Sequence, residues 1–349
     1  MTVALLIDFD EVERQGLIDW KDIIELTEKA LADLGVYGEQ VNHPRRRLHC
    51  PSLTRISLHA GAAMPYGLLG MMIHSELPIV SAEGKALLTQ VVKGRGDYVY
   101  VLYDAGTAAL AAIIRRRRDQ RGVDYRTAAT SAVGTRRLMR EDSRSLALFG
   151  SSHQARSHLH ALSRVMDLKR VRVFSPNPEH RKSFCREMET ALSLAMEPVE
   201  SPSDALAAAD VVLEASNTTV PVFPGRMLQP GMHVTSIAGS NRELAAQQGV
   251  VRKGVDEETI KRSDRIFVNV KEQTRQDRQG EIFQAVSRGY LSWERIGEIG
   301  DLLARKSGGR KNAAQITFYN NNAGIGVVDV SLAAHIYRLA KERGLGREL

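Results

Sequence analysis

Cysteine, aromatic residues and long apolar runs are all scarce in this sequence of 349 residues. Its only cysteines, Cys50 and Cys185, form no Cys-x-x-Cys pair, and two such thiols are typical of a reducing cytoplasm. No apolar run approaches the roughly 20 residues that cross a bilayer. The first apolar run ends at Asp8 and lacks the basic residues of a signal peptide. We therefore expect a cytoplasmic protein that does not bind a membrane.

Patterns that would hold a metal ion or a nucleic acid are also missing. The ten histidines are scattered, and His158 and His160 lie two residues apart, which places them on different faces of a helix. The net charge is +7, and much of it falls in the arginines at 115–118. No aromatic residues are interleaved with these arginines, and no nucleic-acid-binding motif accompanies them. We expect neither a metal site nor a nucleic-acid partner.

The N-terminal part of the chain has the pattern of an α+β fold. Apolar residues at helical spacing predict a helix over 19–34, with Gly35 as its C-terminal cap. Short alternating runs at 56–60, 68–73 and 98–103 predict an antiparallel sheet. Alanine-rich stretches at 107–114 and 127–138 predict two further helices.

From Ser145 onward, short and strongly apolar runs alternate with helical or polar stretches. The runs lie at 146–149, 171–174, 211–214, 233–238 and 266–270. Strands this apolar, alternating with helices, predict a doubly wound parallel sheet covered on both faces. The C-terminal tail does not follow this alternating pattern. It has a strand-like run at 316–319, a turn rich in Asn and Gly, and a helix over 328–343.

A turn with a single glycine follows the first of these strands and opens a helix. Its sequence is Gly150-Ser151-Ser152-His153-Gln154-Ala155, in which Gly150 permits a tight turn and Ala155 is small enough for the helix–sheet contact. Ser152 stands where the dinucleotide fingerprint has its second glycine. The start of the helix offers N–H groups to phosphates. We predict that Gly150, Ser151, Ser152, His153 and Gln154 bind a nicotinamide dinucleotide, together with Ser216 after the strand at 211–214.

The end of the next strand bears on which dinucleotide binds. NAD-specific sites place a carboxylate there, but this sequence continues Ser175-Pro176-Asn177-Pro178, with His180 and Arg181 next. Ser, Asn and Arg can all donate to a 2′-phosphate. We predict that Ser175, Asn177 and Arg181 bind NADP(H), with NAD(H) as a possible cofactor. The alternative for Arg181 is a place on a solvated helix face.

Ordered motifs over nearly the whole chain resemble the ornithine cyclodeaminase/mu-crystallin family. They are Met64-Pro65, Asp104-x-Gly106-Thr107, Arg126-Thr127-Ala128-Ala129, Gly150 with Gln154-Ala155, Ala209-Asp210-Val211-Val212, Pro230-Gly231-Met232-His233-Val234, Arg242-Glu243-Leu244, and Ile316-Thr317-Phe318 with Gly324, Asp329 and Gly344-Leu345-Gly346. The resemblance implies a homodimer and a Rossmann-type domain, residues 126–315, inserted in an α+β substrate-binding and dimerisation domain, residues 1–125 plus 316–349. It also implies hydride transfer between a nicotinamide and an imino or amino acid that carries a carboxylate.

The same resemblance suggests which residues would handle the substrate. Arg126 matches one arginine that grips the substrate carboxylate, and Arg45 is the first choice for the other, with Arg46 second; a solvated loop is the alternative for both. A guanidinium can bond both oxygens of a carboxylate. The family lysine two residues after a glycine is replaced by Met72, which can neither donate nor relay a proton. His74 is a partial substitute.

The family acid before the Arg-Glu-Leu motif is also replaced, by Asn241 or Ser240. A neutral Asn cannot act as a general base, which argues against deamination and in favour of reduction of a preformed imine. Asn241 would still approach the substrate, and asparagines 320–322 would either line the cleft or form a plain turn. Two alternatives remain open: an ornithine cyclodeaminase in which His74 or Lys85 replaces the lysine, and a non-catalytic protein that binds a ligand beside NADPH.

Overall fold

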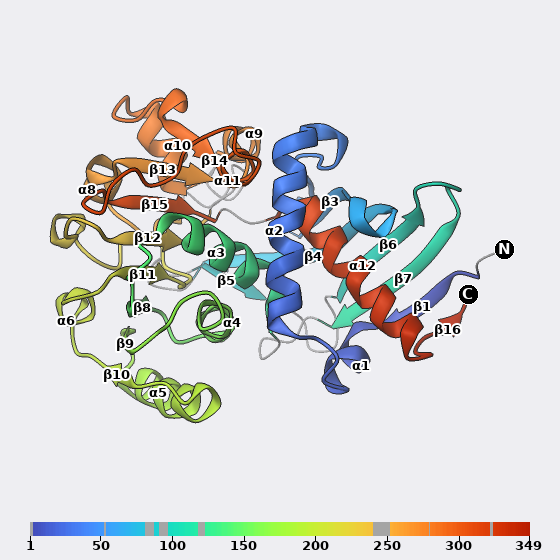
Figure 1. Cartoon of the computed structure of the whole chain (residues 1–349), viewed down its shortest axis with the longest axis horizontal. Helices are drawn as coiled ribbons and strands as arrows, with labels where there is room; N and C mark the ends of the chain where they lie inside the picture. The colour runs from blue at the N-terminus through green and yellow to red at the C-terminus, as the bar shows by residue number, and fades with distance from the viewer. Residues whose placement is uncertain are drawn as a thin grey trace. The chain divides into compact units, whose positions relative to one another are not determined.

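The computed structural model describes residues 3–51, 54–80, 87–90, 97–117, 123–239, 252–278, 280–321 and 324–349. The chain forms two compact units (Figure 1). The first comprises Met1–Ile79, Thr89–Gly122 and Gly324–Leu349, and the second comprises Val80–Leu88 and Val123–Ala323.

The first unit is built on a mostly antiparallel sheet. Its strands are β1 (Leu5–Asp8), β2 (Arg46–His49), β3 (Arg55–Ala63), β4 (Leu68–Val80), β5 (Leu87–Gln90), β6 (Asp97–Asp104), β7 (Leu110–Arg117) and β16 (Arg347–Glu348). They lie in the order β16-β1-β7-β6-β4-β3-β2, and β5 pairs with β4. The β1–β7 pair is parallel, and the other pairs in this row are antiparallel. The antiparallel sheet expected from the alternating runs is therefore present.

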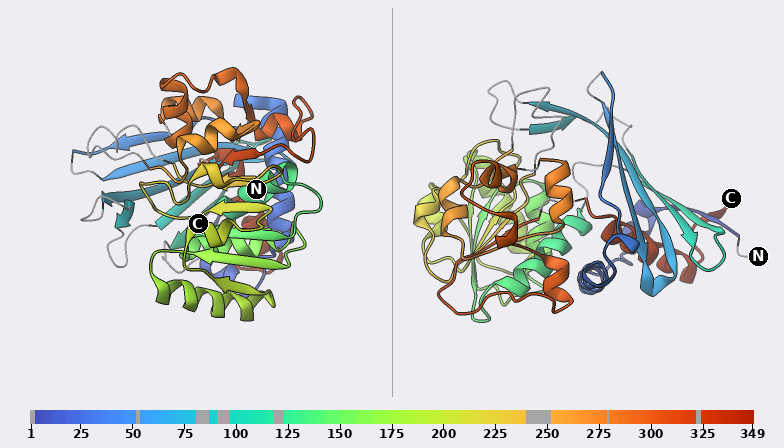
Figure 2. Two further views of the ribbon diagram at one scale, coloured as in Figure 1. Left: turned by 90° about the vertical axis from the view of Figure 1, so that its left-hand side faces the viewer. Right: turned by 90° about the horizontal axis from the view of Figure 1, so that it is seen from above.

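A long helix near the C-terminus packs on this sheet, and a second long helix packs against the first (Figure 2). The helical segments of the unit are α1 (Phe9–Arg14), α2 (Trp20–Tyr37), η1 (Gly38–Gln40), η2 (Met64–Tyr66) and α12 (Gly326–Glu342). Helix α12 begins directly on β3, where a Cβ atom on Gly326 would overlap the backbone of Ala60. Glycine therefore allows the first turn of α12 to touch the sheet.

Two expectations for this unit are wrong in detail. The alanine-rich stretch 107–114 is not a helix, because its second half belongs to β7, which pairs with both β1 and β6. Two-sided strand pairing outweighs the helix propensity of alanine. Helix α2 starts after its cap Asp19 as expected, but it continues past Gly35 and ends at the left-handed Gly38.

The second unit is a doubly wound parallel sheet, as the sequence predicted. Its strands are β8 (Ser145–Phe149), β9 (Arg170–Phe174), β10 (Met196–Pro198), β11 (Val211–Glu214), β12 (His233–Ser236), β13 (Arg265–Val268), β14 (Ile296–Glu298) and β15 (Thr317–Asn320). They lie in the order β10-β9-β8-β11-β12-β15-β13-β14, and every pair is parallel.

Helices pack on both faces of this sheet. They are α3 (Tyr125–Leu138), α4 (His153–Leu162), α5 (Pro178–Leu192), α6 (Pro202–Leu206), η3 (Gly225–Met227), α8 (Glu257–Arg262), α9 (Lys271–Gln276), α10 (Gly280–Ser287), η4 (Trp293–Arg295) and α11 (Ile299–Leu303). On one face, residues of α6, α8 and α10 form a continuous buried core with alternate strand residues such as Phe149, Val212 and Phe318. On the other face lies α3, whose Thr135 hydrogen-bonds Thr235 of β12 at 2.8 Å.

The tail enters the second unit before it returns to the first. Strand β15 lies between β12 and β13, so the parallel sheet extends beyond the boundary expected at 316, and the chain re-enters the first unit at Gly324. The β-branched and aromatic run Ile316–Tyr319 suits a central strand with neighbours on both sides. Among the described residues, no helix combines the length and apolar character needed to span a membrane.

Candidate active site

The turn after β8 lies at the carboxyl end of the parallel sheet. Gly150 has φ +124°, and a Cβ atom there would overlap the carbonyl oxygen of Ala215 at the end of β11. Its N–H donates to the carbonyl of Phe174 at 2.9 Å, which ties the turn to the end of β9. Ser152 precedes α4 without capping the helix through its side chain. The backbone at position 150 therefore accepts only glycine. Because the Ser152 side chain does not cap α4, the N–H groups at the start of this helix remain available to a phosphate.

The side chains after β9 are held close to this turn. Ser151 Oγ donates to Ser175 Oγ at 3.0 Å. Asn177 caps α5, because its Oδ1 accepts the N–H of His180 at 3.0 Å. Arg181 is buried, donates from Nη1 to the carbonyl of Ser175 at 3.0 Å, and pairs through Nη2 with Glu200. Arg181 therefore lies under the strand end rather than on a solvated helix face, and Glu200 already occupies one of its donors.

Two buried carboxyl groups lie beside the end of β11, and sequence reasoning missed them. Ser236 Oγ lies 2.9 Å from Glu214 Oε2 and 3.3 Å from Glu281 Oε1, so one hydroxyl links the two. Glu214 Oε1 also accepts the backbone N–H of Ser216 at 3.0 Å. Burial, with added repulsion from Glu214, raises the pKa of Glu281 to about 7. Ser216, which the sequence predicted as a cofactor contact, is thus anchored by Glu214.

Arg126 lies in the first turn of α3, next to the helix cap Asp124. Asp124 accepts from the N–H of Thr127 at 2.9 Å and from Gln154 Nε2 at 2.7 Å. Burial alone would raise the pKa of Asp124, but the charge of Arg126 and these hydrogen bonds hold it well below its usual range. Gln154 of α4, which the sequence predicted to bind the cofactor, therefore donates to the ionised carboxylate of Asp124 and so links the starts of α3 and α4.

The other predicted carboxylate ligand, Arg45, belongs to the first unit. It is buried just before β2, and a Cβ atom on Gly324 would overlap its guanidinium. Arg46, the second choice, is exposed at the start of β2. Arg45 thus packs against the segment that leads into α12.

A buried imidazole–carboxylate pair lies beneath the first turn of α12. His59 Nδ1 of β3 is 2.7 Å from Asp329 Oδ2, and both residues are almost fully buried. The register of β3 and β4 places His59 directly opposite Met72, the residue that stands where the family has lysine. Sequence reasoning matched Asp329 only as a motif residue and missed His59. A single histidine in the middle of a strand carries no signal by itself.

His74, the predicted substitute for that lysine, lies beside His59 and Met72 but has a different carboxylate neighbour. Its Nδ1 lies 3.3 Å from the sulfur of Met72, and its ring packs edge-on against His59 with centroids 5.4 Å apart. Its Nε2 lies 4.0 Å from Glu76, which forms a buried ion pair with Arg55. The structure therefore places two imidazoles, each beside a carboxylate, on the helix-covered face of this sheet.

The remaining candidates fall into two groups. Asn320 and Asn321 are buried and structural: Asn320 Nδ2 donates to the carbonyl of Ala238 at 3.2 Å, and Asn321 Nδ2 donates to the carbonyl of Thr127 at 2.9 Å. Ser240, Asn241, Asn322 and Lys85 lie outside the described residues. Among the residues that the structure describes, no three His, Cys, Asp or Glu side chains gather in a way that could hold a metal ion.

The sequence model of the ornithine cyclodeaminase/mu-crystallin family matches residues 93–344. The chain belongs to this family. Among curated members, the Delta(1)-pyrroline-2-carboxylate reductase of Bacillus cereus is 27% identical over 225 residues, which are 64% of this chain and 66% of the relative. The matched segment therefore spans slightly less than two thirds of that relative's length.

Solved structures of similar proteins extend the likeness over the whole chain. The Delta(1)-pyrroline-2-carboxylate reductase of Thermococcus litoralis, in complex with NADH and L-proline, has a TM-score of 0.81 at 24% identity and covers 99% of this chain and 100% of its own. An archaeal alanine dehydrogenase dimer with bound NAD has a TM-score of 0.82 at 22% identity and covers 99% of this chain and 98% of its own. At these identities the likeness establishes the fold.

Proposed function

We propose that this member of the ornithine cyclodeaminase/mu-crystallin family is an NAD(P)H-dependent reductase of an imino acid, acting in reverse as an amino acid dehydrogenase. The observation that carries the proposal is the Gly150 turn at the carboxyl end of a doubly wound parallel sheet, where dinucleotides bind in such sheets. The Bacillus cereus and Thermococcus litoralis proteins, which reduce an imine in a ring that carries a carboxylate according to their names, support this substrate class.

The residues described above suit the parts of this reaction. The Gly150 turn and the start of α4 would hold the pyrophosphate of the cofactor, which when bound supplies a hydride to the imine carbon. Arg45 and Arg126 would bind the substrate carboxylate, each able to form two hydrogen bonds with it. A proton must also reach the imine nitrogen, so that C=N becomes CH–NH.

We propose that His59 supplies this proton in place of the family lysine. The Asp329 carboxylate accepts a hydrogen bond from Nδ1 of His59, so Nε2 is the nitrogen that gains or loses the proton. The same carboxylate stabilises the imidazolium when it forms. Met72, which faces His59 across the strand pair, offers no proton of its own. Deamination of ornithine would need a general base that Asn241 does not provide, so reduction remains the better candidate.

A substrate screen tests the proposed reaction. Purified protein with NADPH or NADH would be mixed with five- and six-membered cyclic α-imino acids, and the absorbance of the reduced nicotinamide followed. We expect consumption of the reduced cofactor to depend on the imino acid. Ammonia release from ornithine with NAD would favour a cyclodeaminase instead, and tight NADPH binding without turnover on any substrate would favour a ligand-binding protein.

We also propose that NADP(H) is the preferred cofactor. Strand β9 ends without a carboxylate, and Ser175 and Arg181 lie at that end. Because Glu200 is exposed and pairs with Arg181, a 2′-phosphate could replace Glu200 as the partner of this guanidinium. In a fluorescence titration, Glu200→Gln should bind NADPH several-fold more tightly and NADH unchanged. Equal effects on both cofactors would contradict this assignment.

We also propose that the protein is a homodimer and, because its sequence contains only two cysteines, that it works in the cytoplasm. The archaeal alanine dehydrogenase of the same fold is described as a dimer. Light scattering on the purified protein should give twice the 38.6 kDa mass of one chain. A mass equal to one chain would exclude the dimer.

A further inference from the structure

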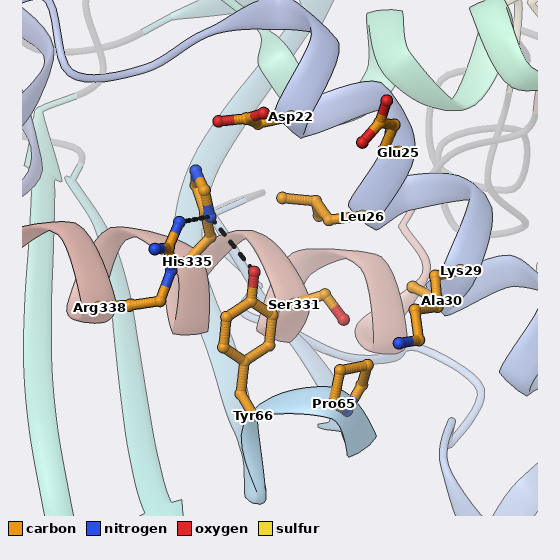
Figure 3. Close-up of a pocket in the computed structure, with 10 residues that line it drawn as sticks. All are labelled: Asp22, Glu25, Leu26, Lys29, Ala30, Pro65, Tyr66, Ser331, His335 and Arg338. Carbon is orange, nitrogen blue, oxygen red and sulfur yellow. Dashed lines mark hydrogen bonds between the residues drawn. The ribbon is translucent and has the colours of Figure 1, made fainter.

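A cavity of about 310 Å³ opens in the first unit between α2, η2 and α12 (Figure 3). Four charged side chains border it: Asp22, Glu25 and Lys29 of α2, and Arg338 of α12. None of them takes part in the proposed reduction. A cavity of this size suits a small molecule rather than a peptide or a nucleotide.

His335 of α12 forms one wall of the cavity, and its protonation state follows from its neighbours. Its Nδ1 lies 3.3 Å from Arg338 Nη2 and 3.2 Å from the hydroxyl of Tyr66, as the dashed lines in Figure 3 show. A guanidinium only donates, so Nδ1 must accept. Burial, reinforced by the charge of Arg338, lowers the pKa of His335, so the ring is neutral at pH 7. Its single proton therefore lies on Nε2.

That Nε2–H group is a buried donor without an acceptor. His335 is 2% exposed, and within the part of the chain that the structure describes Nε2 has no hydrogen-bond partner. In Figure 3 the ring turns this nitrogen toward the side of the cavity where Asp22 lies. Buried polar groups in folded proteins are almost always paired. The cavity is therefore expected to hold a group that accepts from Nε2.

The charges around the cavity indicate what kind of molecule carries that acceptor. Arg338 donates to His335 and to Glu342, at 2.8 Å for the latter, which leaves further N–H groups of the guanidinium available. Asp22 and Glu25 lie one turn apart on α2 and can both face a cation. Glu25 already lies 4.0 Å from Lys21, and Arg338 already pairs with Glu342. An anion alone would therefore leave Asp22 unmatched, and a cation alone would leave Nε2 of His335 unmatched.

We propose that this cavity, called the α2–α12 cavity below, binds a small amino acid as its zwitterion. The ligand carboxylate accepts from Nε2 of His335 and from Arg338, and the ligand ammonium lies between Asp22 and Glu25. The site is separate from the proposed active site and does not depend on the reductase activity.

Calorimetric titration of the full-length protein tests the α2–α12 cavity, with glycine, L-alanine and L-proline as probes and acetate and methylammonium as single-charge controls. Asp22→Asn and Arg338→Gln each remove one charged partner and leave the helix surfaces otherwise intact. We expect each to weaken amino acid binding by roughly 10- to 100-fold, the effect of losing a hydrogen bond to a charged group. Asp33→Asn, also on α2 but outside the cavity, should leave the affinity unchanged.

Three outcomes would overturn the proposal. Absence of saturable binding by any of the amino acids would mean that the cavity holds only water. Binding that persists unchanged in both Asp22→Asn and Arg338→Gln would place the amino acid elsewhere, including at the proposed active site. Acetate that binds as tightly as glycine would show an anion site and contradict the zwitterion. Circular dichroism of each variant checks that it is folded.

Discussion

Replacing Glu281 by glutamine should change how the stability of the second unit depends on pH. Glu281 is 2% exposed at the start of α10, and its Oε2 finds no hydrogen-bond donor among the residues that the structure describes. An ionised carboxylate there would be poorly solvated and would face the nearby Glu214. These conditions favour the protonated form in the folded state and raise the pKa of Glu281 from its ordinary value of 4.5 to about 7.

The sign and size of the effect follow from linkage. Because the folded-state pKa is raised, the stabilisation is fully present below about pH 4.5 and is lost as the pH rises through about 7. The difference between 4.5 and about 7 corresponds to about 3 kcal/mol. Glutamine keeps the shape of the protonated group and cannot ionise. Glu281→Gln should therefore match the wild type in acid and be more stable, by up to about 3 kcal/mol, in weak base.

Urea denaturation followed by circular dichroism provides the assay, at about pH 5 and about pH 8, with the free energy of unfolding compared between the two proteins. Glu272→Gln is the matched control, because Glu272 lies on the neighbouring helix α9 with its side chain half exposed. The control should shift the free energy of unfolding equally at both pH values. Glu214→Gln should also reduce the pH dependence, since it removes the carboxylate that faces Glu281.

The reasoning fails if wild type and Glu281→Gln lose the same free energy of unfolding between the two pH values. That result would mean that Glu281 is ionised throughout in the folded state. A lower stability of Glu281→Gln at the higher pH would also contradict it, because an ionised Glu281 would then be stabilising.

Three further predictions concern the proposed active site. Gly150→Ala should weaken NADPH binding at least tenfold and destabilise the second unit by about 1–3 kcal/mol, because of its positive φ and the overlap with Ala215; Gly308→Ala, where the space is open, is the control. Arg45→Lys and Arg126→Lys should each raise KM for an imino acid by roughly 10- to 100-fold with NADPH affinity unchanged, since lysine cannot bond both oxygens. His59→Gln should lower kcat by about 10²- to 10⁴-fold and remove an ionisation from its pH profile, while NADPH binding is retained; an unchanged pH profile would assign His59 a structural role only.

The parallel sheet could be predicted because its strands are buried on both faces. Strands β8 and β11 are largely apolar and buried along their length, and their order along the chain matches a doubly wound fold. Strand β9 instead alternates between arginine and apolar residues. The boundary of the tail could not be predicted in the same way. The run before Asn320 is short, and only its pairing with β12 and β13 shows that it belongs to the parallel sheet.

The stretch 107–114 shows where local propensity fails. Its alanines favour a helix, but Asp104 accepts from the N–H groups of Gly106 and Thr107, and this turn directs the chain back along β6 as β7. Pairing with β1, which lies about a hundred residues earlier in the chain, completes the strand. A helix was predicted because that partner cannot be inferred from the alanines themselves.

Pairing also explains which parts of the candidate site were missed. The sequence predicted Arg181 as a donor near the cofactor, but its ion pair with Glu200 depends on where β10 runs beside β9. His59 and Asp329 lie 270 positions apart and meet only because β3 pairs with β4 in one register and α12 packs on β3. A shift of one residue in that register would turn His59 to the opposite face of the sheet, away from both Met72 and Asp329. The proposed role of His59 therefore depends on the register of two strands, and a variant that preserves His59 but disturbs this register should lose activity as His59→Gln does.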